Sequence, residues 1–249
     1  MAQQKSIIKL SGTIGDLTFY QSQDGHLVKS KSSIPASKIA NDPNFARTRE
    51  NGSEFGSSAQ AGKLLRDAVR TLMMSSADNR ATSRVTQVMT VIKNYDTTSV
   101  RGQRNVGLGI ATPDGKAALK GFNFNINSVL AATLYKPYAV NTTTGVISIA
   151  SLIPNVDVAF PSGATHLTLK GAWAKIDFTG NTTDVEFTNL LNVPIDGTST
   201  AVTLTPTAVP TGTGISLFFL AIDFFQEVNG IQYTLKNGAY NSLAIIEVV

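Results

Sequence analysis

The sequence predicts a mainly β protein of the α+β class, in which a β-hairpin arm and two helices precede an antiparallel β-sandwich. Between residues 53 and 95, apolar residues recur every three or four positions, which is the spacing of one helix face. After residue 106, apolar residues instead alternate over short runs that turn residues separate. That second pattern is typical of antiparallel sandwiches, and we expect an immunoglobulin-like or jelly-roll-like one.

Residues 1–52 are expected to form the hairpin arm and a connector. Apolar runs predict strands at residues 7–10, 14–20 and 26–31. Asp24-Gly25 is a hairpin signal between the last two. Because a sheet of this size is only marginally stable alone, we expect it to lie on the back domain or on a neighbouring subunit. An exposed strand edge favours the addition of strands to a neighbouring subunit. Residues 32–52 show no periodic pattern and are expected to be an irregular connector.

Residues 53–105 are expected to form a helical hairpin followed by a polar bridge. The first helix is predicted from Ser53 to Met74 and the second from Asn79 to Tyr95, with a turn at residues 75–78. The predicted apolar face of the first helix consists of Phe55, Ala59, Gly62, Leu65, Val69, Leu72 and Met73. A glycine inside a helix costs about 1 kcal/mol relative to alanine. Gly56 and Gly62, in the first half of this helix, therefore predict the close approach of another backbone.

Residues 106–249 are expected to form the sandwich. Strands or parts of strands are predicted at residues 106–110, 122–126, 129–135, 145–149, 157–160, 166–170, 173–178, 184–188, 202–205, 215–228, 231–235 and 242–249. The clearest hairpin joins residues 218–228 to residues 231–235 through Asn229-Gly230.

The composition favours assembly over catalysis. Charged residues make up 15% of the chain, below the ~25% that is usual in globular domains, and interface centres are depleted of charge. Residues 1–120 carry 17 of the 21 Lys and Arg and 9 of the 17 Asp and Glu, whereas residues 121–249 carry 4 and 8. Opposite net charges of +8 and −4 allow copies of the chain to attract one another.

No pattern in the chain predicts a catalytic residue, a cofactor or a metal ion. There is no Cys, and the two histidines, His26 and His166, have no neighbours with metal-ligand spacing. Gly107-Leu108-Gly109 lacks the Lys and Ser or Thr of a phosphate-binding loop. Asp184 and Glu186 alternate on a predicted strand and could bind Ca²⁺ or act as a glycosidase pair, but a solvated strand face is the interpretation we favour.

Basic residues concentrate around the predicted helices. They are Arg47, Arg49, Lys63, Arg66, Arg70, Arg80, Arg84, Lys93, Arg101 and Arg104. Such a cluster could bind nucleic acid, but interleaved acidic residues and the lack of an aromatic platform weaken that alternative. Pairing with the acidic half of a neighbouring subunit accounts for the same residues.

Aromatic residues in the predicted sandwich leave a binding module as the main alternative function. Trp173, Tyr135, Tyr138, Tyr233 and Tyr240 could form a platform for carbohydrate or another cell-surface ligand. β-Sandwiches often have this role, which is an argument by fold analogy.

The front of the chain contains short motifs that resemble those of a known group of proteins. Residues 7–20, followed by Asp24-Gly25 and by Arg47-Thr48-Arg49-Glu50-Asn51, resemble the N-terminal section of uncharacterised proteins from Bacteroidota and their phages. The resemblance covers about the first 75 residues. It implies a Gly-containing hairpin, a Pro-containing connector and a helix before a β domain, and a structural role.

These observations predict a non-enzymatic structural subunit that forms a homo-oligomer, as a symmetric or filamentous particle of a virion or a cell. Strand addition by the arm and packing of the first helix would make the contacts. The candidate interface residues are Leu17, Phe19, Tyr20, Phe55, Ala59, Gly62, Arg66 and Arg70. The start of the chain lacks the apolar run of a secretory signal, and no segment has the length of a membrane span, so we expect synthesis in the cytoplasm and possible function in a virion or an extracellular particle.

Overall fold

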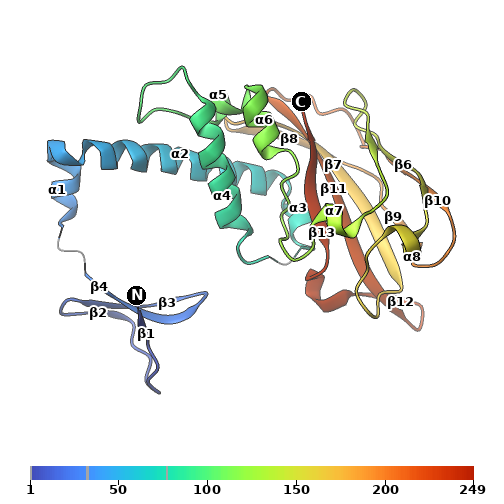
Figure 1. Ribbon diagram of the computed structural model, residues 1–249, viewed down its shortest axis with the longest axis horizontal. Helices are drawn as coiled ribbons and strands as arrows, with labels where there is room; N and C mark the ends of the chain where they lie inside the picture. Colours follow the sequence, from blue (N-terminus) through green and yellow to red (C-terminus); the bar gives the residue numbers. More distant parts are fainter. Residues whose placement is uncertain (1, 32–33, 77) are drawn as a thin grey trace. The chain divides into compact units, whose positions relative to one another are not determined.

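The computed structural model describes residues 2–31, 34–76 and 78–249. The chain forms two compact units, and the division falls between Arg49 and Glu50 (Figure 1). The residues up to Arg49 are called the N-terminal unit, and residues 50–249 are called the body. The structure is mixed α+β, and the body is a β-sandwich whose larger sheet carries helices on its outer face. The predicted fold class is therefore confirmed.

Within residues 2–31, the N-terminal unit is a four-stranded antiparallel sheet in the spatial order β1-β4-β3-β2. The strands are β1 (Ala2–Gln3), β2 (Gly12–Ile14), β3 (Leu17–Ser22) and β4 (Gly25–Ser30). The hairpin predicted at Asp24-Gly25 joins β3 to β4. Gly25 has a φ of 104°, a conformation that favours glycine.

The strand predicted at residues 7–10 is wrong, because β1 occupies the place beside β4. The side chain of Gln4, which follows β1, accepts a hydrogen bond from Leu10 N at 2.9 Å and donates one to the Leu27 carbonyl at 3.1 Å. This amide ties the 7–10 segment to the sheet without a strand ladder. The hydrogen bonds of a polar side chain hold this segment in place, and the apolar pattern of the sequence does not predict them.

Residues 34–52 are mainly helical, which corrects the predicted irregular connector; residues 32 and 33 of that connector lie outside the described residues. The elements here are α1 (Ala36–Asn41), the 3₁₀ helix η1 (Pro43–Phe45) and the start of α2 (Ala46–Ala68). Asp42 caps η1 by accepting a hydrogen bond from Asn44 N at 2.9 Å, and Pro43 occupies the first helical position. Both are helix-start signals, and they lie in the sequence ahead of the predicted start.

The predicted helical hairpin is present in the body. Besides α2, its helices are α3 (Arg70–Met73) and α4 (Ala81–Ile92). The first helix breaks at Val69, where φ and ψ are −110° and 24°. A Cβ added to Gly62 would lie 3.2 Å from Val85 Cγ1 and 3.6 Å from the backbone N of Thr86, so α4 of the same chain makes the predicted close approach at Gly62. The prediction is wrong for Gly56, because no described atom outside its own helix backbone lies within 4 Å of a Cβ added there. Residue 77 of the predicted turn at residues 75–78 lies outside the described residues.

The strand predicted at residues 106–110 is wrong, because this segment is helical. The hairpin is followed by η2 (Lys93–Tyr95), α5 (Val106–Ile110) and α6 (Pro113–Leu119). Asn105 caps α5 and Thr112 caps α6, each by accepting a backbone hydrogen bond. A Cβ added to Gly109 would lie 2.1 Å from the Ile92 carbonyl oxygen. Glycine in this segment therefore serves close helix packing.

Within residues 78–249, the larger sheet of the sandwich contains six antiparallel strands. They are β7 (His166–Asp177), β8 (Thr182–Phe187), β9 (Leu191–Pro194), β11 (Ile215–Val228), β12 (Ile231–Thr234) and β13 (Ser242–Val248). β7 and β11 form the centre. Each outer position holds two short strands, β12 and β13 beside β11 and β8 and β9 beside β7. The hairpin predicted at Asn229-Gly230 is confirmed as the β11–β12 connection.

The smaller sheet is also antiparallel, in the order β10-β6-β5. Its strands are β5 (Ala139–Val140), β6 (Ile147–Leu152) and β10 (Thr200–Leu204), and the short helices nearby are α7 (Leu130–Thr133), α8 (Pro154–Asp157) and η3 (Leu235–Gly238). The strands predicted at residues 129–135 and 157–160 are wrong, since each range overlaps a helix and keeps a single bridge, Leu134↔Val158. Residues 122–126 contribute only the Asn123↔Ala244 bridge.

The described part of the body has hydrophobic clusters on both faces of the larger sheet. On β11, Leu217 and Phe219 pack with the helices, whereas Phe218 and Leu220 pack with the smaller sheet. Neighbouring side chains of a strand point to opposite faces, and a strand covered on both faces forms a continuous apolar run. The run at residues 216–221 therefore marks the middle layer of the body.

Candidate functional site

The three predicted arm anchors lie on β3, on both faces of the N-terminal sheet. Leu17 and Phe19 are two residues apart and share one face. Tyr20 is on the opposite face, where Lys29 Nζ lies 5.5 Å from the centroid of its ring. The structure thus separates Tyr20 from the other two anchors.

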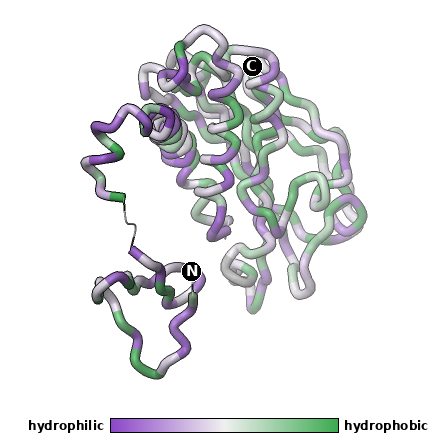
Figure 2. Tube along the Cα trace, turned by 60° about the vertical axis from the view of Figure 1, so that its left-hand side comes forward, coloured by the Kyte–Doolittle hydropathy of each residue, from purple (hydrophilic) through white to green (hydrophobic). Residues whose placement is uncertain are grey.

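An apolar sheet face, defined as Ile14, Leu17, Phe19 and Val28, forms one side of the N-terminal sheet. Directly paired residues of an antiparallel sheet share a face, and the register pairs Ile14 with Leu17 and Val28 with Phe19. Ile14 is 62% exposed and Leu17 is 45% exposed. Residues 2–31 and 34–49 contain no buried residue. Figure 2 shows hydrophobic stretches, in green, within this exposed trace.

The predicted contact residues of the first helix do not share one surface. Gly62 is buried against α4, and Ala59 is half-buried. Arg66 donates hydrogen bonds at 3.1 Å to the Gly62 carbonyl and to a threonine of α4. Phe55 and Arg70 are exposed. Phe55 and Arg70 are thus the members of this set that remain accessible on the surface of the body.

Phe55 lines a groove of about 520 Å³ between α2 and α4. This α2–α4 groove is formed by Phe55 on α2 and by α4 residues that include Thr82, Thr86, Thr90 and Val91. None of the charged residues that the structure describes lines it. The groove thus brings Phe55, a predicted contact residue, together with a face of α4 for which the sequence predicted no contact.

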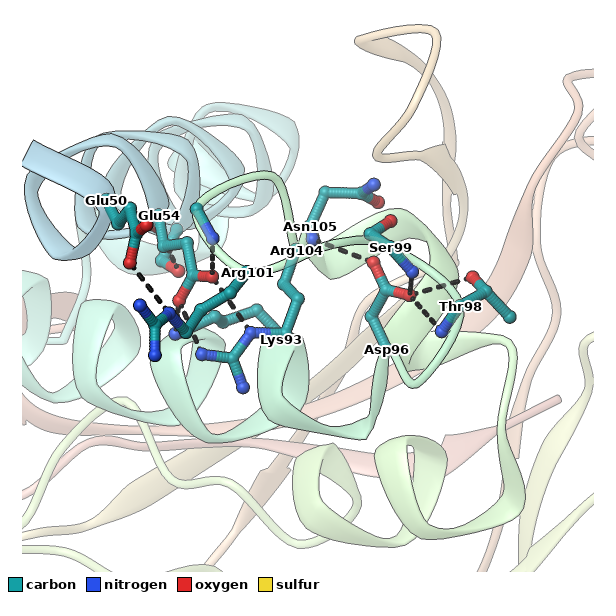
Figure 3. Close-up of polar contacts among 11 residues, drawn as sticks. Glu50, Glu54, Lys93, Asp96, Thr98, Ser99, Arg101, Arg104 and Asn105 are labelled. Atoms are coloured by element: carbon teal, nitrogen blue, oxygen red, sulfur yellow. Dashed lines mark hydrogen bonds and ion pairs between the residues drawn. The ribbon is translucent and has the colours of Figure 1, made fainter. Parts of the chain in front are cut away.

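A buried ion cluster, centred on Glu54, holds the loop after η2 against α2 (Figure 3). Glu54 is 1% exposed, and its carboxylate pairs with Lys93 and Arg104. Arg104 Nε lies 2.8 Å from Oε1 and Arg104 Nη2 lies 2.9 Å from Oε2. Gly102 N donates to Oε1 at 2.8 Å. Arg101 and Glu50 add an exposed pair at 2.8 Å.

Asp96 orders the same loop from within. Its carboxylate accepts hydrogen bonds from the backbone N–H and hydroxyl of Thr98, and from the N–H groups of Ser99 and Asn105, at 2.9 to 3.1 Å (Figure 3). Burial alone would raise the pKa of Asp96, but the bonds from Ser99, Asn105 and Thr98 outweigh it and hold the pKa well below its usual range. The loop is therefore closed around a charged carboxylate.

The Glu54 cluster is built for cohesion and not for proton transfer. The Arg104 guanidinium, opposed by burial and aided by Lys93 and Gly102, lowers the pKa of Glu54 to about 2. A general acid or base needs a pKa near the working pH. Both carboxylate oxygens already accept hydrogen bonds within the chain, so Glu54 is poorly suited to bind or activate a substrate.

Sequence reasoning missed Glu54, because the residue spacing on α2 fits two helix faces equally well. The buried positions of α2 include Glu54, Ser58, Ala61 and Leu65, which are spaced by four, three and four residues. The predicted face ran through Phe55 instead, one position away. Steps of three and four residues back from Leu65 lead either to Glu54 or to Phe55. Only the folded structure, in which Glu54 meets Lys93 and Arg104, shows that the face with Glu54 is the buried one.

A second buried pair joins the helical layer to the larger sheet. Asp223 on β11 pairs with Lys170 on β7, and Ser75 Oγ lies 3.1 Å from Asp223 Oδ1 and 3.0 Å from Lys170 Nζ. Burial raises the pKa of Asp223, against the effect of Lys170 and Ser75. Ser75 and Lys170 both contact the Asp223 carboxylate, so this cluster ties Ser75 to the two central strands of the larger sheet.

Many basic residues that could have met nucleic acid are bonded within the chain. Arg49, Arg66, Arg84, Lys93, Arg101 and Arg104 all donate to groups of this chain. Arg84, for example, reaches the carbonyl oxygens of Asn123 and Phe124 at 2.6 and 2.8 Å. The number of basic residues around the helices is therefore larger than the number of side chains free to bind phosphate groups.

The aromatic residues do not form a single platform. Trp173 is 4% exposed and stacks on Phe218 with ring centroids 5.3 Å apart, so it belongs to the core and not to a ligand platform. Tyr135 and Tyr138 together line a pocket of about 450 Å³ beside β13. Tyr233 is exposed on β12, away from the residues that line this pocket.

The carboxylates predicted to alternate do share a face of β8, but each has a hydroxyl partner. Asp184 Oδ2 accepts hydrogen bonds from Thr211 N at 2.7 Å and from its hydroxyl at 3.0 Å. Glu186 accepts one from Thr207 at 2.5 Å. His166 lies on β7, with Nε2 3.5 Å from Glu227. The described ranges hold no group of three His, Cys, Asp or Glu side chains placed to bind a metal ion.

The chain matches no protein-family model, no curated protein and no solved structure in the comparisons made. In the part of the chain that the structure describes, no helix combines the length and apolar character needed to cross a membrane. The function is therefore argued from the surfaces and clusters described above.

Proposed function

We propose that the chain is a non-enzymatic structural subunit that assembles with copies of itself into a symmetric or filamentous particle, with the N-terminal unit as the main contact. One observation carries the proposal: this unit has an apolar sheet face, yet none of its described residues is buried. A small sheet becomes stable when its hydrophobic face is covered by another layer. A second copy of the chain could cover this face, and it is present wherever the chain itself is made.

The charge distribution supports the same proposal. Residues 1–120 carry 17 Lys and Arg against 9 Asp and Glu, and residues 121–249 carry 4 against 8. Opposite charges on two parts of one subunit favour contacts between copies, over distances of roughly 8 Å in physiological salt. The resemblance of the first 75 residues to proteins of Bacteroidota and their phages supports a particle of phage or bacterial origin.

The ion clusters support a role without catalysis. The carboxylates of Glu54 and Asp223 are buried and paired with cations of the chain. Groups in this state stabilise local structure, and their charges are not available to a substrate.

Removal of residues 1–31 tests the proposal. We expect light scattering and negative-stain imaging to show assembly of the full chain and a folded monomer for the truncated chain. Fluorescence of the single tryptophan, Trp173, reports whether the body remains folded. If the truncated chain assembles as the full chain does, the N-terminal unit is not the contact.

Two double variants test whether assembly depends on the apolar sheet face or only on the presence of residues 1–31. Leu17→Asp with Phe19→Asp places charge on the apolar sheet face and is expected to abolish assembly. Thr13→Asp with Thr18→Asp is the matched control, because these two residues pair with each other on the opposite face. Loss of assembly in both double variants would mean that the apolar face has no special role.

Carbohydrate binding is a second candidate function with one supporting observation. Two tyrosines, Tyr135 and Tyr138, line the same pocket beside β13, and sugar rings stack on such side chains. Glycan-array binding that is lost in Tyr135→Ala, with the body still folded, would favour this candidate. No binding by the full chain would remove it.

A further inference from the structure

The α2–α4 groove has the properties of a contact surface. Phe55 is 58% exposed and Val91 is 44% exposed, and both line the groove. Exposed apolar side chains that lie together mark sites of interaction. The lining contains no charge, as expected of the centre of an interface.

Threonine hydroxyls on α4 are turned to the helix backbone. Thr86 Oγ1 donates to the Thr82 carbonyl at 3.0 Å, and Thr90 Oγ1 donates to the Thr86 carbonyl at 2.9 Å. With these hydroxyls satisfied, the remaining surface of each side chain is mainly its methyl group. This face of α4 consists largely of residues classed as polar, but the surface that it exposes is mainly apolar.

The groove and the apolar sheet face have similar dimensions. With ~3.3 Å per residue and ~4.8 Å between strands, the N-terminal sheet covers about 270 Å². Figure 1 shows that α2 and α4 cross, and the groove takes Phe55 from α2 and its other lining residues from α4 and η2. The groove therefore runs along α4 for roughly 18 Å, at 1.5 Å per residue. Strands β3 and β4 have six residues each and are about 20 Å long at ~3.3 Å per residue, so their length matches that of the groove.

The area also indicates how many contacts are needed. If the whole sheet is covered, one sheet on one groove buries at most about 540 Å² in total, which is the size of a weak contact, whereas specific interfaces exceed about 1,000 Å². A reciprocal exchange between two copies doubles this upper bound to about 1,100 Å². Each copy has one sheet and one groove, so a reciprocal pair leaves neither surface uncovered.

We infer that the apolar sheet face of one copy docks in the α2–α4 groove of a second copy, and that two copies exchange their N-terminal units in this way. The inference rests on the proposed self-assembly and names the surface that receives the N-terminal unit. Leu17 and Phe19 supply the sheet side, and Phe55 and Val91 supply the groove side.

Cysteine cross-linking tests the pairing, because the chain contains no Cys. Leu17→Cys and Val91→Cys chains, one of them lengthened by a tag, are mixed and treated with a short thiol-specific cross-linker. We expect a mixed dimer on a denaturing gel. The matched control replaces Val91→Cys with Leu190→Cys, at a 68% exposed leucine outside the groove, and is expected to give only background cross-linking.

A charge in the groove gives an independent measurement. Val91→Lys is expected to weaken dimer formation at least tenfold in sedimentation equilibrium, with Leu190→Lys unchanged. Both positions are exposed, so the body should fold in each variant, as Trp173 fluorescence reports.

The possible outcomes separate this inference from the proposed function. If the chain assembles but Leu17→Cys reacts equally with both partners, or with neither, the groove is not the receiving surface and self-assembly stands. If the chain is a monomer and a Leu17→Cys, Val91→Cys double variant cross-links within itself, the sheet docks on its own chain. That outcome contradicts both proposals.

Discussion

The N-terminal unit and the body differ in how their apolar residues are covered. The body buries both faces of its larger sheet, one under helices and the other under the smaller sheet. The N-terminal sheet has good strand pairing and an apolar face, but residues 2–31 and 34–49 include no buried side chain. Hydrogen-bonded strands alone do not make a stable domain, since most of the free energy of folding comes from buried apolar surface. This difference suggests that the body folds alone and that the N-terminal unit requires a partner.

Hydrogen exchange should show the largest contrast between the two regions. At concentrations where the chain is monomeric, amides of β3 and β4 are expected to open at a free-energy cost near zero. Amides of β7 and β11 should open only with the whole body, for which ~5–15 kcal/mol is usual. Mass spectrometry measures both sets. Equal protection of the β3 and β11 amides in the monomer would contradict the conclusion that the N-terminal unit needs a partner.

Truncation of one phenylalanine in each region should give the next largest effect. Phe219 is 0% exposed, and Phe219→Ala is expected to lower the free energy of unfolding of the body by about 3–5 kcal/mol. Phe19→Ala is the matched variant, and we expect no change in the same measurement. Denaturant unfolding followed by Trp173 fluorescence reports the body specifically. A loss of more than about 1 kcal/mol in Phe19→Ala would show that the two regions are energetically coupled.

The buried and exposed ion pairs of the body offer a smaller contrast. Glu54→Gln leaves Lys93 and Arg104 without their carboxylate and is expected to cost about 3 kcal/mol of unfolding free energy. Glu50→Gln affects an exposed pair with Arg101 and should cost less than about 1 kcal/mol. Thermal or denaturant unfolding measures both. Similar costs for the two variants would mean that burial of the cluster is not what makes it stabilising.

The last contrast is the dependence of the stability of the body on pH. The pKa of Glu54 is lowered from 4.5 to about 2 in the folded chain. A depressed folded pKa gives stability that is present above the unfolded pKa and is lost as the pH falls through the folded one. The body should therefore lose stability between about pH 4.5 and 2, and Glu54→Gln should show a shallower loss. Equal slopes for the two proteins would remove Glu54 from this dependence.

Local signals in the sequence predicted the parts of the fold that depend on neighbours in the chain. Asp24-Gly25 and Asn229-Gly230 marked real hairpins, because few residues other than glycine, asparagine and aspartate accept the backbone of such turns. The helical hairpin followed from spacings of three and four. Strands β11 and β13 followed from apolar runs, because side chains on both faces of the larger sheet are buried.

The errors share a physical cause. Residues 106–110 have strand-like composition, but the cap at Asn105 and the close packing of Gly109 on η2 make them helical. Residues 34–52 look irregular, yet Asp42 and Pro43 start a helical segment. In both places one or two capping or packing contacts decide the structure, and the apolar pattern does not show them.

The sequence by itself determined the class of the fold, the presence of an apolar segment ahead of the body and the opposite charges of the two halves, because these depend on composition and on spacing along the chain. Only the tertiary structure decided that Leu17 and Phe19 share a face with Ile14 and Val28. It also decided that Glu54 is buried among cations and that Phe55 borders a groove with α4. Those properties depend on strand register and on contacts between residues far apart in the chain, and no local pattern encodes them.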